Sequence, residues 1–270
     1  MTNRSYFRLI SLGLGFAFLY LPILMLIIYS FNESRFVNVW GGFSTKWYQT
    51  LFENDEILDA AFLSIKIAAV TATISVFIGT LAALALVRFG NFKGRFLFSG
   101  LVTAPLVMPE VIIGLSFLLL FIALESLTGW PSNLGFSTIT IAHVTLSLAY
   151  VVIIIRARLQ SFDYSLEEAA LDLGAKPYKV FFKITLPIIM PALCAAWLLA
   201  FTLSLDDLVV ASFVTGPGAT TLPMAIYASI RTGVSPEINA LATLIVLFIS
   251  LGIAMAAIIM NRKRNDRASY

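Results

Sequence analysis

Six long apolar stretches limit what this chain can fold into more than any other feature of its sequence. A helix needs roughly 20 predominantly apolar residues to cross the hydrocarbon core of a bilayer, which is about 30 Å thick. Of the 270 residues, 59% are hydrophobic and 12% are charged, about half the charged fraction of an ordinary soluble domain. We therefore predict an all-α integral membrane protein with six transmembrane helices. The predicted spans are Leu9–Tyr29, Phe62–Val87, Leu97–Leu124, Phe136–Ile155, Ile188–Val214 and Ile238–Met260.

The positions of Lys and Arg predict how these spans are oriented. Cytoplasmic loops of membrane proteins carry an excess of both residues. Fourteen of the eighteen Lys and Arg fall on one side of the six-span arrangement, and the segments on the other side are mainly acidic. We expect that basic side, with both termini, to be cytoplasmic. The fourteen are Arg4, Arg8, Arg88, Lys93, Arg95, Arg156, Arg158, Lys176, Lys179, Lys183, Arg262, Lys263, Arg264 and Arg267.

Proline residues interrupt the third predicted span at Pro105 and Pro109. Each removes a backbone donor, which a membrane tolerates where neighbouring protein or a watery cavity satisfies the freed groups. We expect this helix to be broken or kinked and to face the protein interior. The aromatic-rich linker 30–59 should contain a short surface helix, and the amphipathic stretch Met224–Arg231 suggests a re-entrant or interfacial element.

The loop 156–187 after the fourth span is the most informative stretch. Ser165 and Glu168 have capping-box spacing, so a short helix should begin there, and Gly174 followed by Pro177 should end it. A second helical piece should run from about Tyr178 towards Leu186. The first piece has exposed apolar residues, and a groove on a partner protein would cover them.

The residues of this loop resemble the EAA loop, E-A-A-x3-G-x9-I-x-L-P, of membrane subunits of bacterial ABC importers of the binding-protein-dependent type. The resemblance implies a fold like that of type I importer permeases and a loop that docks on a dimer of ATP-binding ABC subunits. It also implies a second permease subunit in a heterodimer and a periplasmic binding protein. The matching residues are Glu168, Ala169, Ala170, Gly174, Ile184, Leu186 and Pro187.

A more extensive resemblance, over most of the chain, is to polyamine permeases of the PotI and PotC type. It implies a multi-pass protein of the bacterial inner membrane, with putrescine as the first candidate substrate, spermidine next, and a polyamine-binding protein as the delivering partner. Permeases for other small solutes share parts of the same motifs. The segments that carry the resemblance are 103–114 (TAPLVMPEVIIG), 200–209 (AFTLSLDDLV), 216–223 (GPGATTLP) and 236–244 (PEINALATL).

Three acidic residues, Glu110, Asp206 and Asp207, fall within or near the predicted spans. An acidic side chain at bilayer depth costs about 2.5–3.5 kcal/mol on insertion scales, so such residues usually face a cavity or a transport pathway. Carboxylates also suit a dicationic diamine. Helix capping is the alternative role for all three, and either aspartate could pair with Arg231.

The sequence points away from an enzyme. It contains no Gly-x4-Gly-Lys-Ser/Thr phosphate loop, so ATP hydrolysis would have to come from a partner subunit. We expect no catalytic residue and no cofactor. Cys194 and His143 are the only cysteine and histidine, so no metal site is expected. His143 should be a buried, hydrogen-bonded side chain, with proton coupling or metal binding as the alternative role. The basic residues set membrane orientation, so nucleic acid is not an expected partner.

We interpret residues 1–270 as one membrane domain. A secondary transporter driven by an ion gradient is a competing hypothesis, because broken helices and intramembrane acids suit it too. A membrane scaffold or receptor is another, but it leaves the broken third span without a role.

Overall fold

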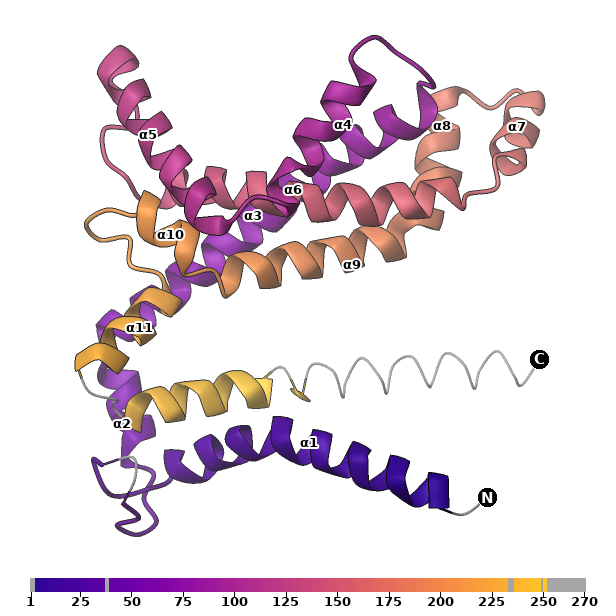
Figure 1. Ribbon diagram of the computed structural model, residues 1–270. Helices are drawn as coiled ribbons and strands as arrows, with labels where there is room; N and C mark the ends of the chain where they lie inside the picture. Colours follow the sequence, from indigo (N-terminus) through magenta and orange to yellow (C-terminus); the bar gives the residue numbers. More distant parts are fainter. Residues whose placement is uncertain (1–2, 37–38, 233–235, 249, 252–270) are drawn as a thin grey trace. The chain divides into compact units, whose positions relative to one another are not determined.

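The computed structural model describes residues 3–36, 39–232, 236–248 and 250–251, and this part of the chain contains helices and no strand (Figure 1). The elements are α1 Asn3–Ser30, α2 Lys46–Glu53, α3 Asp55–Arg88, α4 Arg95–Thr103, the 3-10 turn η1 Ala104–Leu106, α5 Glu110–Thr128, α6 Phe136–Gln160, α7 Ser165–Asp172, α8 Pro177–Val180, the π-helical turn η2 Phe181–Thr185, α9 Leu186–Leu205, α10 Val209–Val214 and α11 Leu222–Thr232. A further apolar helix spans Pro236–Phe248.

Five helices among the described residues are long and apolar enough to cross a membrane. They are Phe7–Ser30, Asp55–Arg88, Glu110–Thr128, Phe136–Gln160 and Pro177–Leu205. The chain is therefore an all-α protein with several helices of transmembrane length, as the apolar stretches predict.

The third predicted span, Leu97–Leu124, is divided as its prolines predict. It consists of α4, η1 and α5, separated by residues 107–109. Pro109 adopts an extended backbone with φ −58° and ψ 135°, and α5 begins at the next residue, Glu110. The prediction of a break is confirmed, and the spanning-length helix is α5 alone.

The fifth predicted span forms two helices in the structure, and only part of the sixth lies within the described residues. The fifth, Ile188–Val214, was predicted as one helix, but α9 ends at Leu205 and α10 starts at Val209; this boundary was wrong because the Asp206–Asp207 pair ends the helix. The described residues include 238–248 and 250–251 of the sixth predicted span, Ile238–Met260, and its remaining residues lie outside them.

The chain forms two compact units, residues 1–58 with 226–270, and residues 59–225. In the first unit, the predicted short helix of the linker is present as α2. Trp47 Nε1 donates to the Asn32 carbonyl at 2.7 Å, and the Phe31 ring stacks on Phe43 with centroids 5.4 Å apart. Asn54 Nδ2 donates to Glu237 Oε2 at 3.1 Å, which links the start of α3 to the helix Pro236–Phe248.

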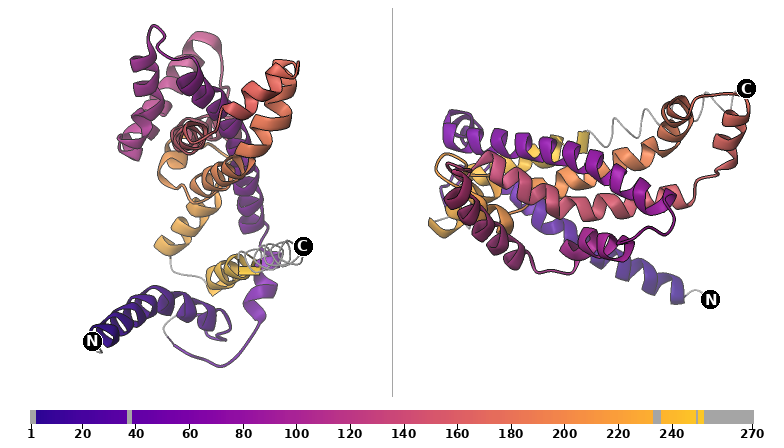
Figure 2. Two further views of the ribbon diagram at one scale, coloured as in Figure 1. Left: turned by 90° about the vertical axis from the view of Figure 1, so that its right-hand side faces the viewer. Right: turned by 90° about the horizontal axis from the view of Figure 1, so that it is seen from above.

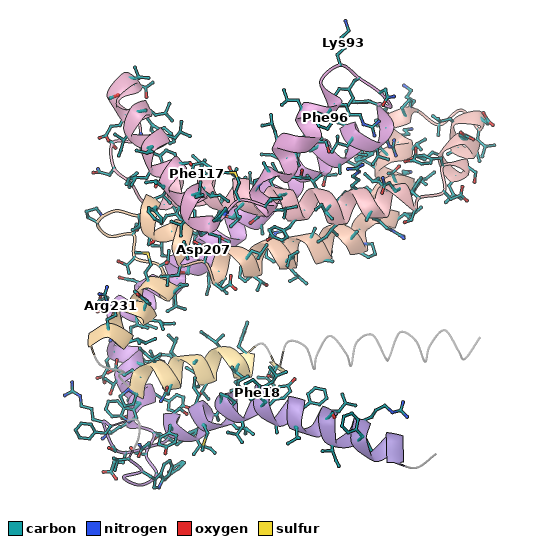
Figure 3. All side chains as sticks on the ribbon, in the orientation of Figure 1. Phe18, Lys93, Phe96, Phe117, Asp207 and Arg231 are labelled. Carbon is teal, nitrogen blue, oxygen red and sulfur yellow. The ribbon has the colours of Figure 1, made fainter. Side chains whose placement is uncertain are left out.

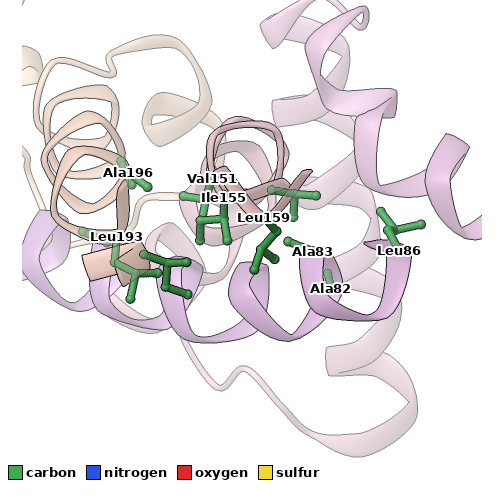
Figure 4. Packing of buried hydrophobic residues seen from close by; sticks show 12 residues of the cluster. Ala82, Ala83, Leu86, Val151, Ile155, Leu159, Leu193 and Ala196 are labelled. Atoms are coloured by element: carbon green, nitrogen blue, oxygen red, sulfur yellow. The ribbon is translucent and has the colours of Figure 1, made fainter. Parts of the chain in front are cut away.

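The core of the second unit is built from α3, α6 and α9 (Figures 2 and 4). Small residues allow close approach: a Cβ added at Gly79 of α3 would lie 2.6 Å from Val151 Cγ1 of α6. Such small-residue contacts are typical of helices packed in membranes. The buried cluster comprises Ala72, Ala82, Ala83, Leu86, Val151, Val152, Ile155, Leu159, Ile189, Leu193, Ala196 and Ala200.

A second buried cluster of the same unit joins α5, α6 and α10 with the start of α3. Phe121 of α5, Ile139 of α6 and Val210 of α10 are almost fully buried in it. A Cβ at Gly114 of α5 would lie 2.6 Å from the ring of Phe213 in α10. The two clusters together fix both ends of α6, with α7 following one end and the α9–α10 junction beside the other (Figure 1).

Candidate functional site

The predicted helix of the loop 156–187 is present as α7 and begins at Ser165, as expected. The predicted capping box was wrong, because Ser165 is already inside the helix and the residue before it makes no side-chain cap. Asp163 takes that role: its Oδ1 accepts from the Ser165 N–H at 3.0 Å. Hydrogen bonds from the Ser165 hydroxyl and N–H lower the pKa of the exposed Asp163 carboxyl below its ordinary value of 3.8.

Gly174 ends α7 in the way its position predicts. Its φ of +80° lies in the left-handed region that favours glycine. The Gly174 N–H donates to the Leu171 carbonyl at 2.8 Å, and the Ala175 N–H donates to Ala170 at 3.1 Å. These two bonds form a Schellman motif, so the turn depends on a backbone conformation that other residues adopt at a cost.

The second helical piece differs from expectation, because it is not separate from the following span. Helix α8, η2 and α9 form one apolar helix over Pro177–Leu205. Ile184 lies in the π-turn η2, and Leu186 and Pro187 are the first residues of α9. A proline lacks the N–H and crowds the carbonyl four residues earlier, and the widened turn directly before Pro187 accommodates it.

The surface of α7 carries both polar and apolar groups outward. Glu168 and Ala169 are exposed, and Ala170 is partly buried. Leu166 is 48% exposed and Leu173 is 89% exposed. An exposed apolar face on an eight-residue helix with no buried residue is suited to binding a partner.

The three acidic candidates occupy different environments. Asp207 lies between α9 and α10 (Figure 3) and is buried. Its carboxylate accepts from the N–H groups of Val210 at 3.3 Å and Ala211 at 2.8 Å, which caps α10. Asp206 is exposed at the end of α9, and Glu110 is exposed in the first turn of α5.

His143 of α6 completes the environment of Asp207. Its Nε2 lies 3.0 Å from Asp207 Oδ2, and its Nδ1 lies 2.7 Å from Ser204 Oγ. Because an ionised carboxylate only accepts, Nε2 carries the hydrogen, and in a neutral ring Nδ1 accepts from the Ser204 hydroxyl. The prediction of a buried, hydrogen-bonded His143 is confirmed, and the network fixes α6 to the α9–α10 junction.

Two groupings were missed from the sequence: the pairing of His143 with Asp207, and an ion pair between Arg88 and Glu167. The signal for the first was that a histidine and an aspartate at bilayer depth both need partners. For the aspartates, the sequence suggested helix capping or pairing with Arg231 as alternatives to substrate contact. It did not suggest His143 as a partner. Within the described residues, no hydrogen bond or ion pair joins Glu110 to either aspartate.

The sequence was compared with known protein families. Residues 75–264 match the family of binding-protein-dependent transport system inner membrane components. The chain belongs to this family. It is thus a permease component in the bacterial inner membrane, and the predicted family is confirmed.

Two curated relatives and a solved structure resemble the permease over most of its length. It is 57% identical over 264 residues to the putrescine transport system permease protein PotI of Escherichia coli (strain K12), covering 98% of this chain and 94% of the relative. It is 44% identical to the spermidine/putrescine permease PotC of the same strain, covering 92% and 91%. A bacterial ABC transporter for alginate import has a chain of the same fold, with a TM-score of 0.70 at 17% identity and 95% coverage of both.

Proposed function

We propose that this permease subunit translocates polyamines across the inner membrane as part of an ATP-driven ABC importer, with putrescine as the first substrate and spermidine the next. The observation that carries the proposal is the 57% identity to a putrescine permease over 98% of the chain. The aligned region covers 98% of this chain, so the likeness is not confined to one motif.

In the proposed topology the permease has six spans, both termini are cytoplasmic, and residues 1–270 form one membrane domain. The spans are the five helices of transmembrane length and a sixth that begins with Pro236–Phe248. The excess of Lys and Arg on one side supports this orientation. Residues 156–187 then form a cytoplasmic loop, with α7 as its projecting element.

The proposed role of this loop is to receive movement from a dimer of ATP-binding subunits. Its exposed surface, with Glu168, Ala169 and Leu173, docks on the ATPase dimer. Gly174 sets the turn, and Ile184, Leu186 and Pro187 join the loop directly to the helix Pro177–Leu205. Ala170 packs behind the docking face. ATP binding and hydrolysis take place on the partner subunits, and this chain has no ATPase site of its own.

The proposed substrate pathway passes Glu110 and Asp206, the two exposed acids of the set. A diamine carries two positive charges at neutral pH because free amines titrate near the lysine value. Asp207 belongs to the pathway by holding the α9–α10 junction through His143. A second permease chain in a heterodimer provides the other half of the pore, and a periplasmic polyamine-binding protein delivers the substrate.

Uptake in cells lacking the gene tests this proposal. Labelled putrescine, labelled spermidine and an uncharged control solute are supplied with and without restored expression, in a strain free of redundant polyamine systems. We expect loss and rescue of polyamine uptake alone, with putrescine affected more. Unchanged polyamine uptake, or rescue of a different solute, would contradict polyamines as the substrate and leave an importer permease for another small solute.

A further inference from the structure

Three side chains meet beneath α7, where three elements of the second unit come together. Arg88 is the last residue of α3, Glu167 lies in the first turn of α7, and Thr185 closes the π-turn η2. Arg88 Nη2 lies 2.5 Å from Glu167 Oε1. The Thr185 hydroxyl donates to the same Glu167 oxygen. One carboxylate of α7 therefore holds both α3 and the helix Pro177–Leu205.

Burial distinguishes this cluster from an ordinary surface ion pair. Thr185 is fully buried, and the side chains of Glu167 and Arg88 are 12% and 29% exposed. Arg88 Cζ also lies 6.0 Å from the centroid of the Tyr164 ring, which covers one side of the guanidinium. An exposed pair contributes little to stability, but a charge-assisted bond shielded from water and shared by a third group is stronger and more directional.

The neighbouring glutamates of α7 point to different surroundings. Glu168 is exposed, whereas Glu167 is partly buried against Arg88 and Thr185. Glu168 is therefore available to a partner subunit, and Glu167 fastens the helix to the rest of the chain.

Both anchoring elements lead into the buried core. Leu86 of α3, two residues before Arg88, and Ile189 of α9, four residues after Thr185, belong to the same buried cluster. A displacement of α7 would thus act on two core helices at once. Because α7 itself buries no residue, these side-chain bonds connect it to both helices in a way that its own packing does not.

We infer that Glu167 is a positioning residue that transmits movement of α7 to α3 and α9 through Arg88 and Thr185. The inference rests on the proposed coupling role of the loop. Loss of the linkage leaves α7 able to dock on the ATPase but unable to drive the membrane helices, so ATP is hydrolysed without transport.

The test compares single and paired charge reversals in the complete transporter reconstituted in liposomes. Putrescine transported per ATP hydrolysed is measured for Arg88→Glu, Glu167→Arg and the double variant Arg88→Glu/Glu167→Arg. Each single reversal places like charges together and should lower this ratio about tenfold. Typical coupling between two sites changes affinity by roughly 5- to 150-fold, so a change of this size is expected. The double variant restores opposite charges, and its arginine can still bond the Thr185 hydroxyl, so the ratio should recover most of that loss.

Lys93→Glu is the matched control, because Lys93 is an exposed basic residue in the segment that follows α3 (Figure 3). Its ratio should equal that of the unchanged protein. Normal ratios in both single variants, or a double variant as uncoupled as the singles, would overturn the inference. Absence of putrescine transport by the unchanged complex would instead contradict the proposed function.

A milder pair of variants keeps the inference testable if charge reversal prevents assembly. Thr185→Val removes only the hydroxyl that bonds Glu167, and Thr185→Ser retains a hydroxyl. We expect the ratio to fall for Val and to be preserved for Ser. Equal ratios for the two variants would overturn the role of Thr185 in the linkage.

Discussion

Asp206 and Asp207 are adjacent in sequence, and the fold gives them different environments. Asp206 is exposed at the end of α9, whereas Asp207 is buried and accepts hydrogen bonds from His143, Val210 and Ala211. A single-residue step around a helix end thus separates an exposed carboxylate from a buried one that accepts hydrogen bonds within the fold.

Replacing each aspartate separately should reveal this difference. Asp207→Ala leaves buried donors without an acceptor, at about 1–3 kcal/mol for each unsatisfied group, so the thermal unfolding temperature in detergent should drop by several degrees. Asp206→Asn should leave that temperature unchanged and reduce polyamine transport. Equal stability of the two variants would show that the buried network has no structural role.

The lowered pKa of Asp163 gives a prediction about how acid affects the start of α7. Its pKa is lowered in the folded chain by the Ser165 hydroxyl and N–H, so its contribution to stability is present above the ordinary value of 3.8 and is lost as pH falls through the lowered value. Titration of this carboxyl by NMR should give a pKa below that of Asp163 in the unfolded chain. A value at or above the unfolded one would contradict the capping role.

At the residue scale, the sequence was sufficient to predict that His143 is buried and hydrogen-bonded, but not which residue is its partner. That His143 is buried and hydrogen-bonded follows from the cost of an unpaired polar group in a membrane. Its partner Asp207 is 64 positions away, and no local pattern encodes that pairing. The same holds for Arg88 and Glu167, which are 79 positions apart.

At the scale of elements, the main departure from expectation concerns Pro177–Leu205. The loop pattern predicted a second helical piece from about Tyr178 towards Leu186, and the fifth span was predicted to begin separately at Ile188. The structure keeps one helix by widening a turn over Phe181–Thr185. Such π-turns are frequent at functional sites, and this one lies where the loop meets the membrane helix.

The turn after α7 gives a prediction about coupling. Gly174→Ala places a Cβ at φ +80°, which costs roughly 1–2 kcal/mol for an L-residue. Transport per ATP should fall several-fold while hydrolysis continues, and Glu168→Ala should have the same direction of effect. Gly174→Asn is the control, because asparagine tolerates this conformation better. Normal coupling in both Gly174→Ala and Glu168→Ala would remove the loop as the transmitting element.

Packing of α3 against α6 gives a prediction about stability. A Cβ at Gly79 would lie 2.6 Å from Val151 Cγ1, whereas a Cβ at Gly100 of α4 would meet nothing within 4 Å. Gly79→Ala should therefore destabilise the protein by about 1–3 kcal/mol through overpacking. Gly100→Ala should be neutral or stabilising, because alanine favours helix over glycine. Unfolding in detergent compares the two, and a smaller loss for Gly79→Ala than for Gly100→Ala would contradict this packing.

At the scale of the whole molecule, composition and apolar length were sufficient to predict an all-α membrane protein. The broken third span was predictable because proline acts locally. The end of the fifth span at Leu205 was not, since it depends on Asp207 bonding to α6 and α10. The family was predictable from motifs with fixed residue spacing, and hydropathy alone does not contain that information.

We also expect the permease to require partner subunits and ATP for transport. Helix α7 in loop 156–187 has an exposed surface with apolar groups, and in the proposed function a partner that docks there supplies the energy for transport. A secondary transporter would need neither the partner nor ATP.

The most direct test is uptake of labelled putrescine into liposomes that contain either this chain alone or the complete complex with its second permease, ATPase dimer and binding protein. ATP and an imposed ion gradient are supplied separately. The account predicts uptake only by the complete complex and only with ATP. Uptake by this chain alone, driven by the ion gradient, would contradict it.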